Sequence, residues 1–340
     1  MSQPIDIKTK KTIAEFKSTK FDKSLVLDNL EENILTHWET WGKFQQAWTN
    51  SAYNTFKDLE KYIIMMYLIR NYWQSLSDKF RYLSIDEFYD LETIVIDKIN
   101  LISISNELNI PKETIRRKVN ELQNEGILTR SGKSIIFNKR GMNYQKPKAT
   151  LELLSTFIQK KSNLLQDNDW FGEALKKEEV KEFIIKYFTI VWLRFFKLQI
   201  PFLIRHRNVF QDLETWIVWG NIALNQQAQM NKARDKDLLF ENAPERNNYY
   251  KDMANFKIER GINASSIADI SQIPRATVIR KLKWLMRQDV IKKNKNLEYQ
   301  LKSAGKINKQ ISKNTVINQS AVADFLTDIF DYIKNSNFKL

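Results

Sequence analysis

The sequence predicts a mainly α-helical protein built from two similar halves, each of which carries a small β-hairpin. Three observations favour this fold class. Only 8 Gly and 6 Pro stand among the 340 residues, which leaves few turn formers for a fold of many strands. Apolar residues recur every three to four positions over long stretches, the spacing of an amphipathic helix. Residues 100–130 align without gaps with residues 263–293, so one structural unit is expected twice.

The repeated segment holds nine identical positions. They are Asn100/Asn263, Ser103/Ser266, Ile104/Ile267, Ile110/Ile273, Pro111/Pro274, Thr114/Thr277, Arg117/Arg280, Lys118/Lys281 and Leu122/Leu285. A second match pairs Asp90-Leu91-Glu92-Thr93 with Asp212-Leu213-Glu214-Thr215. The two matches are spaced by 163 and 122 residues, a difference of 41. This difference predicts a polar insert at about 223–261 in the second copy, formed by a helix extension and a surface loop.

The first copy predicts a series of short elements. A helix over residues 84–99 comes first, because apolar residues recur there at helical spacing. Asn100 then provides an N-cap for a short helix that turns Ile104 and Leu108 inward. Asn109 tolerates the left-handed backbone that a tight turn between two helices requires.

A second helix and a hairpin complete the unit. Pro111 suits the first position of this helix, and Gly126 is suited to end it. Two short strand-like runs follow, at residues 127–130 and 134–138, around Ser131-Gly132-Lys133. We expect these runs to form a β-hairpin with that tripeptide at its tip.

This order of elements resembles the winged helix-turn-helix of bacterial transcriptional regulators of the MarR and catabolite-activator types. The matching residues are Ile104-Ser105-Asn106-Glu107-Leu108-Asn109-Ile110-Pro111-Lys112-Glu113-Thr114-Ile115-Arg116-Arg117 and Ile267-Ala268-Asp269-Ile270-Ser271-Gln272-Ile273-Pro274-Arg275-Ala276-Thr277-Val278-Ile279-Arg280. Two positions depart from the pattern. Gln272 stands where the turn usually has Gly, and Ala276 replaces the Glu kept at position 113. The pattern therefore leaves the geometry of the turn at Gln272 open, and we expect the two copies to read different bases.

The excess positive charge gathers in the two repeated units. The chain has a net charge of +14, from 54 Lys+Arg against 40 Asp+Glu. Residues 100–140 hold eight cations and four acids, and residues 261–306 hold ten cations and three acids. Most of the excess therefore lies in about a quarter of the chain, which favours contact with an anionic partner such as nucleic acid.

The resemblance assigns roles to the residues of the second helix and the hairpin in each copy. Those implied to face bases in the major groove are Lys112, Glu113, Arg117, Arg275 and Arg280. Those implied to contact phosphates are Thr114, Arg116, Lys118, Arg130, Lys133, Thr277, Lys281, Lys293 and Lys295.

Catalytic chemistry has little support in the sequence. There is no Cys and there are two His, His37 and His206, so thiol chemistry and multi-His metal sites are not expected. Gly132-Lys133-Ser134 lacks the spacing of a phosphate-binding loop. The sequence predicts no enzyme, no metal and no cofactor.

Aromatic residues fall outside the repeated units, at helical spacing. They include Trp38, Trp41, Trp48, Phe56, Tyr62, Tyr72, Trp73, Tyr187, Trp192, Phe195, Phe196, Trp216 and Trp219. Helix packing is the simpler interpretation of this pattern. A pocket for a small-molecule effector is the alternative.

The sequence predicts three regions. Residues 1–35 form a flexible N-terminal arm and a first helix; residues 36–165 form the first repeat, with its core at 100–140; residues 166–340 form the second, with its core at 261–303. Amphipathic helices after each unit, at residues 151–158 and 322–333, resemble the flanking helices through which MarR-type proteins dimerise. The resemblance implies an internal pseudo-dimer, as a monomer or a homodimer.

The predicted function is a cytoplasmic, sequence-preferring regulator of transcription that binds double-stranded DNA and no membrane. A plasmid or phage replication initiator with paired winged helices is one alternative. A chromosome-associated architectural or scaffold protein is another.

Overall fold

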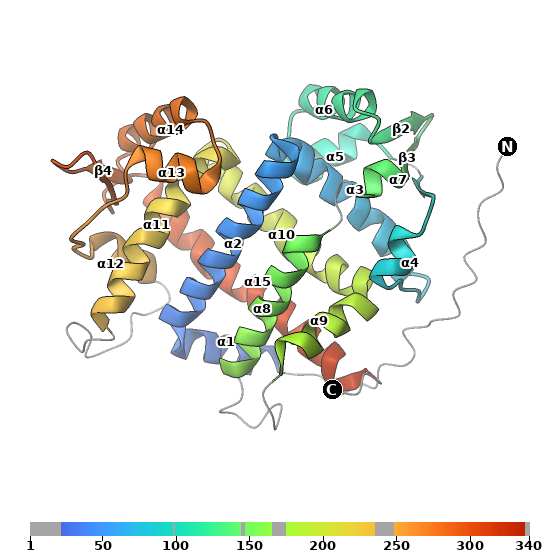
Figure 1. Cartoon of the computed structure of the whole chain (residues 1–340), viewed down its shortest axis with the longest axis horizontal. Coiled ribbons are helices and arrows are strands. Elements are labelled where there is room, and N and C mark those ends of the chain that lie inside the picture. The colour runs from blue at the N-terminus through green and yellow to red at the C-terminus, as the bar shows by residue number, and fades with distance from the viewer. Residues whose placement is uncertain (1–21, 98, 144–146, 165–174, 235–247, 337–340) are drawn as a thin grey trace.

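Helices make up most of the protein, in agreement with the predicted class. A computed structural model describes residues 22–97, 99–143, 147–164, 175–234 and 248–336. Fifteen helices and two small antiparallel sheets lie within this part of the chain (Figure 1). The expected boundary between residues 165 and 166 falls outside the described residues, as does most of the expected N-terminal arm.

Six helices form the centre of the molecule, in two sets of three. The first set is α1 (Lys23–Glu32), α2 (Ile34–Phe56) and α3 (Leu59–Ser77). The second set is α9 (Lys177–Lys186), α10 (Phe188–Phe210) and α11 (Leu213–Arg234). Each helix of the second set begins 154 residues after its partner in the first, and this is the separation of Gln45 from Gln199.

The same local signals end α2 and α10 and begin α3 and α11. Lys57 and Gln211, at the two helix ends, both have positive φ, of 52° and 68°. Asp58 caps α3 by accepting hydrogen bonds from the amides of residues 60 and 61. Asp212 accepts from the amide of Thr215 in α11. An acidic N-cap satisfies free amides and favours the helix dipole, which explains why both helices start there.

The two sets contact each other reciprocally along α2 and α10. The side-chain amides of Gln45 and Gln199 exchange two hydrogen bonds, of 2.9 and 2.7 Å. Trp41 contacts Phe202 and Trp48 contacts Phe195, with ring centroids 5.3 and 4.4 Å apart. These contacts of α2 and α10 are therefore repeated with the two helices exchanged.

The remaining helices lie around this centre. They are α4 (Ile85–Tyr89), α5 (Leu101–Leu108), α6 (Lys112–Asn124), α7 (Lys139–Asn143), α8 (Lys148–Leu164), α12 (Tyr249–Asn255), α13 (Ala264–Ser271), α14 (Arg275–Arg287) and α15 (Asn308–Asn335). Helix α8 packs on α2 and α9, and α15 packs on α10 and α1. Helix α11 ends at Arg234 and is three residues longer than α3, so the start of the expected polar insert belongs to a helix that α3 matches in the first set.

Two hairpins follow α6 and α14. Strands β2 (Leu128–Ser131) and β3 (Ser134–Asn138) form the first, with β1 (Thr93–Ile96) added antiparallel to β3. Strands β4 (Ile291–Lys293) and β5 (Tyr299–Leu301) form the second, and a single bridge joins residues 262 and 299 beside it. The hairpin expected from the first copy is confirmed.

The helix predicted over residues 84–99 is wrong. Only α4 is helical in this segment, started by a capping box between Ser84 and Glu87. Residues 93–96 form β1, whose side chains alternate between exposed and buried. Three of its four residues are Ile or Val and the fourth is Thr, and such β-branched side chains favour a strand.

The predicted pairing of Asp90 with Asp212 is also wrong. Asp90 lies at the end of α4, whereas Asp212 caps a helix of 22 residues, as Asp58 does. Asp58 is separated by 60 residues from its ion-pair partner Lys118, and Asp212 by 69 from Lys281. The second copy is therefore longer by nine residues in this interval, and not by 41.

No single helix of the described segments is long and apolar enough to cross a membrane, although α9 and α10 pass that test as a pair bent by 100°.

Candidate nucleic-acid interface

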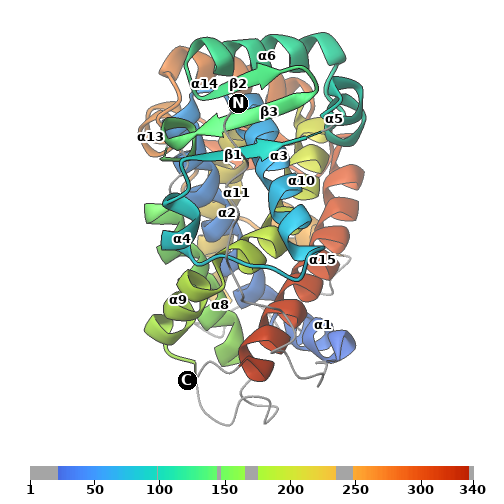
Figure 2. The same cartoon turned by 90° about the vertical axis from the view of Figure 1, so that its right-hand side faces the viewer.

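Helices α6 and α14 lie at the same end of the molecule. Figures 1 and 2 show both at the top, with their hairpins on the outer sides. Helix α6 rests on α3, and α14 rests on α11. Because α3 and α11 belong to the central bundle, the two exposed helices are held in a fixed relation to each other.

The turns that precede α6 and α14 have the same geometry. Asn109 and Gln272 end the preceding helices with φ angles of 51° and 58°. Pro111 and Pro274 follow, each with a φ of −52°. Gln272 therefore adopts the left-handed conformation that a Gly usually supplies, and the turn of the second copy has the geometry of the first.

Identical residues of the two copies account for most of this shared geometry. Asn100 and Asn263 cap α5 and α13 through their side chains. The apolar identities are fully buried and are Ile104, Ile110, Leu122, Ile267, Ile273 and Leu285. Arg117 and Arg280 are different, because both are exposed and their identity serves neither a cap nor the core.

Lys118 and Lys281 are buried, contrary to the prediction from the sequence. Both were expected to contact phosphates, yet their relative exposures are 7% and 8%. Lys118 pairs with Asp58, and Lys281 pairs with Asp212 at 2.5 Å. Each lysine turns inward and ties its helix to the N-cap of α3 or α11, so neither is available to a phosphate.

The exposed face of α6 carries mixed charge. Lys112, Glu113, Arg116 and Arg117 are all exposed, and Thr114 is half-buried. The carboxylate of Glu113 is 2.7 Å from the guanidinium of Arg116. Arg117 lies 3.4 Å from Glu121. Acidic side chains therefore accompany both of its arginines.

The exposed face of α14 is cationic throughout. The helix contains five Lys and Arg and no acid, and Arg275 and Arg280 are exposed. Arg275 bonds the hydroxyl of Ser265 at 3.1 Å, and Thr277 is half-buried. Among the described residues, Arg280 has no ion-pair partner.

Two further cations belong to this face of α14 but were not assigned a role from the sequence. Arg280, Lys283 and Arg287 line one shallow surface hollow together with Met286. The three cations follow one another at spacings of three and four residues, so the helical period alone was sufficient to find Lys283 and Arg287.

The hairpins add exposed cations beside each helix. Arg130 and Lys133 are exposed on the first hairpin, and Lys293 and Lys295 on the second. Lys292 is also exposed and was not assigned from the sequence. All the sequence-predicted site residues except Lys118 and Lys281 therefore lie at least partly exposed on the two units at this end.

Neither histidine belongs to this surface. Burial lowers the pKa of His37 well below its usual value, and it lowers the pKa of His206 to about 4. Within the described residues, no group of three or more His, Asp or Glu side chains has the arrangement to hold a metal ion.

No protein-family model, no curated protein and no solved structure matches this chain. Function must therefore be inferred from its own geometry and charge.

Proposed function

We propose that this protein is a sequence-preferring regulator of transcription that binds double-stranded DNA through two winged helix-turn-helix units. In this proposal α6 and α14 are the recognition helices and enter the major groove, where a helix fits and base edges can be read. The hairpins β2–β3 and β4–β5 are the wings and contact the sugar-phosphate backbone.

The observation that carries the proposal is the joint position of the two helices. Both present exposed arginines at one end of the molecule, and both rest on helices of one bundle. A DNA duplex offers a row of phosphates with base edges between them, so two cationic helices on one side match one duplex. Unrelated surface charge gives no reason for Arg117 and Arg280 to recur in corresponding positions.

An internal pseudo-dimer is part of the proposal. It is supported by the spacing of 154 residues between the two sets of central helices, and by the reciprocal amide bonds of Gln45 and Gln199. Such an arrangement places two similar readers about a local two-fold axis within one chain. Because the two readers differ in sequence, the preferred site is an imperfect palindrome.

The proposed roles follow the geometry of each side chain. Arg117 and Arg280 pair with guanine, and Glu113 accepts a hydrogen bond from cytosine. Lys112 and Arg275, at the first positions of the two helices, face neighbouring bases. Phosphate contacts come from Thr114, Arg116, Arg130, Lys133, Thr277, Lys293 and Lys295, and the proposal adds Lys283, Arg287 and Lys292 because their side chains are exposed beside them.

Selection of DNA from a random pool, carried out at about 50 and 200 mM salt, tests this proposal. We expect an enriched asymmetric motif whose bound fraction falls with salt, because phosphate contacts release counterions. Binding that enriches no motif and disappears at the higher salt would contradict a regulator and indicate an architectural role. Tandem copies of one motif with local strand opening would indicate a replication initiator instead.

A further inference from the structure

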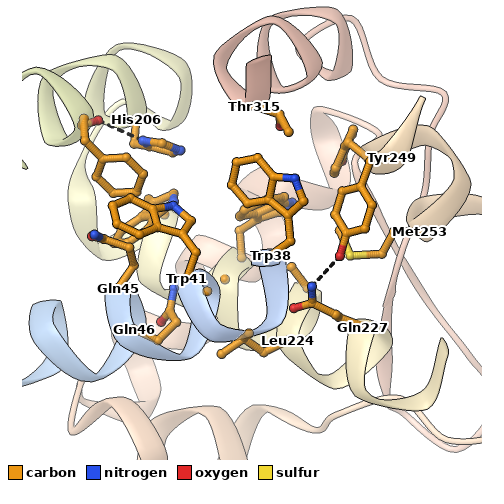
Figure 3. Close-up of a pocket in the computed structure, with 17 residues that line it drawn as sticks. Trp38, Trp41, Gln45, Gln46, His206, Leu224, Gln227, Tyr249, Met253 and Thr315 are labelled. Atoms are coloured by element: carbon orange, nitrogen blue, oxygen red, sulfur yellow. Dashed lines mark hydrogen bonds between the residues drawn. The ribbon is translucent and has the colours of Figure 1, made fainter. Parts of the chain in front are cut away.

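A cavity lies in the helical bundle on the side of the second unit. It is enclosed by α2, α10, α11, α12 and α15 and has a volume of about 100 Å³. Seven of its 17 lining residues are four tryptophans, two tyrosines and Phe202. Figure 3 shows Trp38, Trp41, Tyr249 and His206 around this space.

The polar side chains of the wall, which include three glutamines, Thr315 and His206, are all neutral. Nδ1 of His206 lies 2.8 Å from the carbonyl oxygen of Phe202, so Nδ1 carries the proton and Nε2 is left as an acceptor. Burial lowers the pKa of His206 to about 4, which keeps the ring neutral. Nε1 of Trp38 is a buried donor with no partner among the described residues. None of the lining side chains carries a charge at neutral pH.

The corresponding place in the first half of the bundle is filled. At a spacing of 154 residues, Gly42 corresponds to Phe196 and Gly220 corresponds to Met66. Phe196 is 5% exposed and its ring contacts Trp73 at 5.1 Å, and Met66 is fully buried. Two glycines in the cavity wall thus stand where the other half has two large side chains.

Polar side chains accompany this replacement. At the same spacing of 154 residues, Gln46 of the cavity wall corresponds to Ile200, and His206 of the wall corresponds to Ala52. A Cβ atom on Gly220 would lie 1.7 Å from Nε2 of Gln46, so only glycine leaves room for this amide. Glycine inside a helix is destabilising relative to alanine, and a cavity forfeits packing contacts. An occupant would restore the packing contacts that the cavity forfeits.

We propose that this cavity binds a neutral, one-ring aromatic molecule that carries an amide or lactam edge. The flat aromatic walls suit a ring of this size, and the edge supplies an acceptor for Trp38 and a donor for His206. A carboxylate or phosphate group would lose its hydration without gaining a cationic partner, because the wall has none.

The cavity is joined to the second unit through α11. This helix lines the cavity with Trp216 and Gly220, and it also packs against α14. The side chain of Gln226, on the same helix, donates to the carbonyl of Met253 and accepts from the amide of Leu301. An occupant therefore contacts the element that supports α14. Any effect of the occupant on DNA binding rests on the proposed function, whereas binding of the occupant to the cavity does not.

Binding is tested on the full chain without DNA, with uracil and nicotinamide as neutral probes and benzoate as the anionic control. Each probe is titrated into the protein, and binding is measured by tryptophan fluorescence and by calorimetry. At least one of the two neutral probes should bind saturably, with one molecule per chain and a Kd below about 1 mM. Benzoate should bind at least about tenfold more weakly. Absence of binding by both neutral probes at 10 mM overturns the proposal, and equal binding of benzoate overturns the neutral class.

Three variants locate the site. Gly42→Phe restores the residue type of the filled half and should abolish binding while the chain stays helical by circular dichroism. His206→Ala introduces the residue found at the corresponding position 52 and should weaken binding at least about tenfold, which keeps the test open if Gly42→Phe does not fold. Lys43→Ala, on an exposed side chain next to the cavity glycine, should bind as the wild type does. Unchanged binding in folded Gly42→Phe or in His206→Ala overturns the assignment.

Discussion

Helices α6 and α14 have the same length, follow turns of the same geometry and rest on corresponding helices, yet their charges differ. Helix α6 has four cations and two acids, and α14 has five cations and no acid. In the alignment of the two units, Glu113 and Glu121 of α6 correspond to Ala276 and Trp284 of α14. The backbone of the unit is thus kept while its surface is changed.

Under the proposed function, this difference separates two tasks that DNA recognition combines. A face without acids attracts phosphates of any sequence, whereas a carboxylate among arginines permits some bases and repels the backbone. We therefore expect α14 to supply more of the affinity and α6 to supply more of the discrimination.

The largest expected effect concerns the ion pairs that hold the two helices in place. Asp58→Ala removes an N-cap and leaves Lys118 buried without its partner, and should lower the free energy of unfolding by about 3 kcal/mol. Asp212→Ala should cost about 2 kcal/mol, because the Asp212 carboxylate is 43% exposed against 25% for Asp58. Urea denaturation measures both. Equal losses would show that exposure does not distinguish the two pairs.

The next effect concerns acid stability, to which both buried histidines, His37 and His206, should contribute. An unfolded histidine titrates near 6.5, and burial lowers the pKa of His206 to about 4 in the folded chain. The folded chain therefore binds fewer protons than the unfolded chain between these values, and the free energy of unfolding falls as the pH falls through this window. The full shift corresponds to about 3 kcal/mol.

His206→Ala checks this pH dependence. The variant should lose less stability than the wild type between pH 7 and pH 4, measured by urea denaturation at several pH values. A residual slope should remain, because burial also lowers the pKa of His37. Identical slopes for the variant and the wild type would show that His206 is not a source of acid sensitivity.

An intermediate effect concerns the two corresponding arginines on DNA. Arg280→Ala should weaken binding to a selected site by about 2 kcal/mol, and Arg117→Ala by about 1 kcal/mol, because Glu121 lies near Arg117. Fluorescence anisotropy at fixed salt measures both. Lys23→Ala is the control, on α1 at the opposite end of the molecule (Figure 1). If neither arginine variant binds less tightly than the control, the two helices do not read DNA.

Local signals in the sequence were sufficient for the parts of the fold that depend on neighbours along the chain. The caps Asn100 and Asn263, the turn at Asn109 and the hairpin after Gly126 all follow from residue types at fixed spacing. The helix predicted over residues 93–96 is wrong because the apolar spacing of so short a run suits a helix and a strand equally. Pairing with β3, which lies about 40 residues further along the chain, makes this segment a strand.

The rest depended on contacts between distant segments. A lysine next to an exposed arginine gives no sign that it turns inward, and the burial of Lys118 becomes visible only with Asp58 beside it. The cavity depends on Gly42 and Gly220, which lie on different helices. The repeat of the central helices was present in the sequence, as Phe56, Asp58, Leu59 and Glu60 recurring 154 residues later. The segment from Phe88 to Thr93 matches the same residues at one more position, so sequence identity alone favours the wrong pairing.

The smallest expected effect exchanges the residues that distinguish the two faces. Ala276→Glu gives α14 the acid of α6 and should weaken DNA binding by about 0.5–1 kcal/mol, because the new carboxylate approaches phosphates. Glu113→Ala should strengthen binding to unselected DNA by about 0.5 kcal/mol for the converse reason. A glutamate in the first turn also favours the helix dipole, so Ala276→Glu should not lower stability. Anisotropy on random DNA, with urea denaturation as the control, separates these effects. A weakening in both variants would mean that helix stability, and not the carboxylate's effect on DNA, is what the exchange changes.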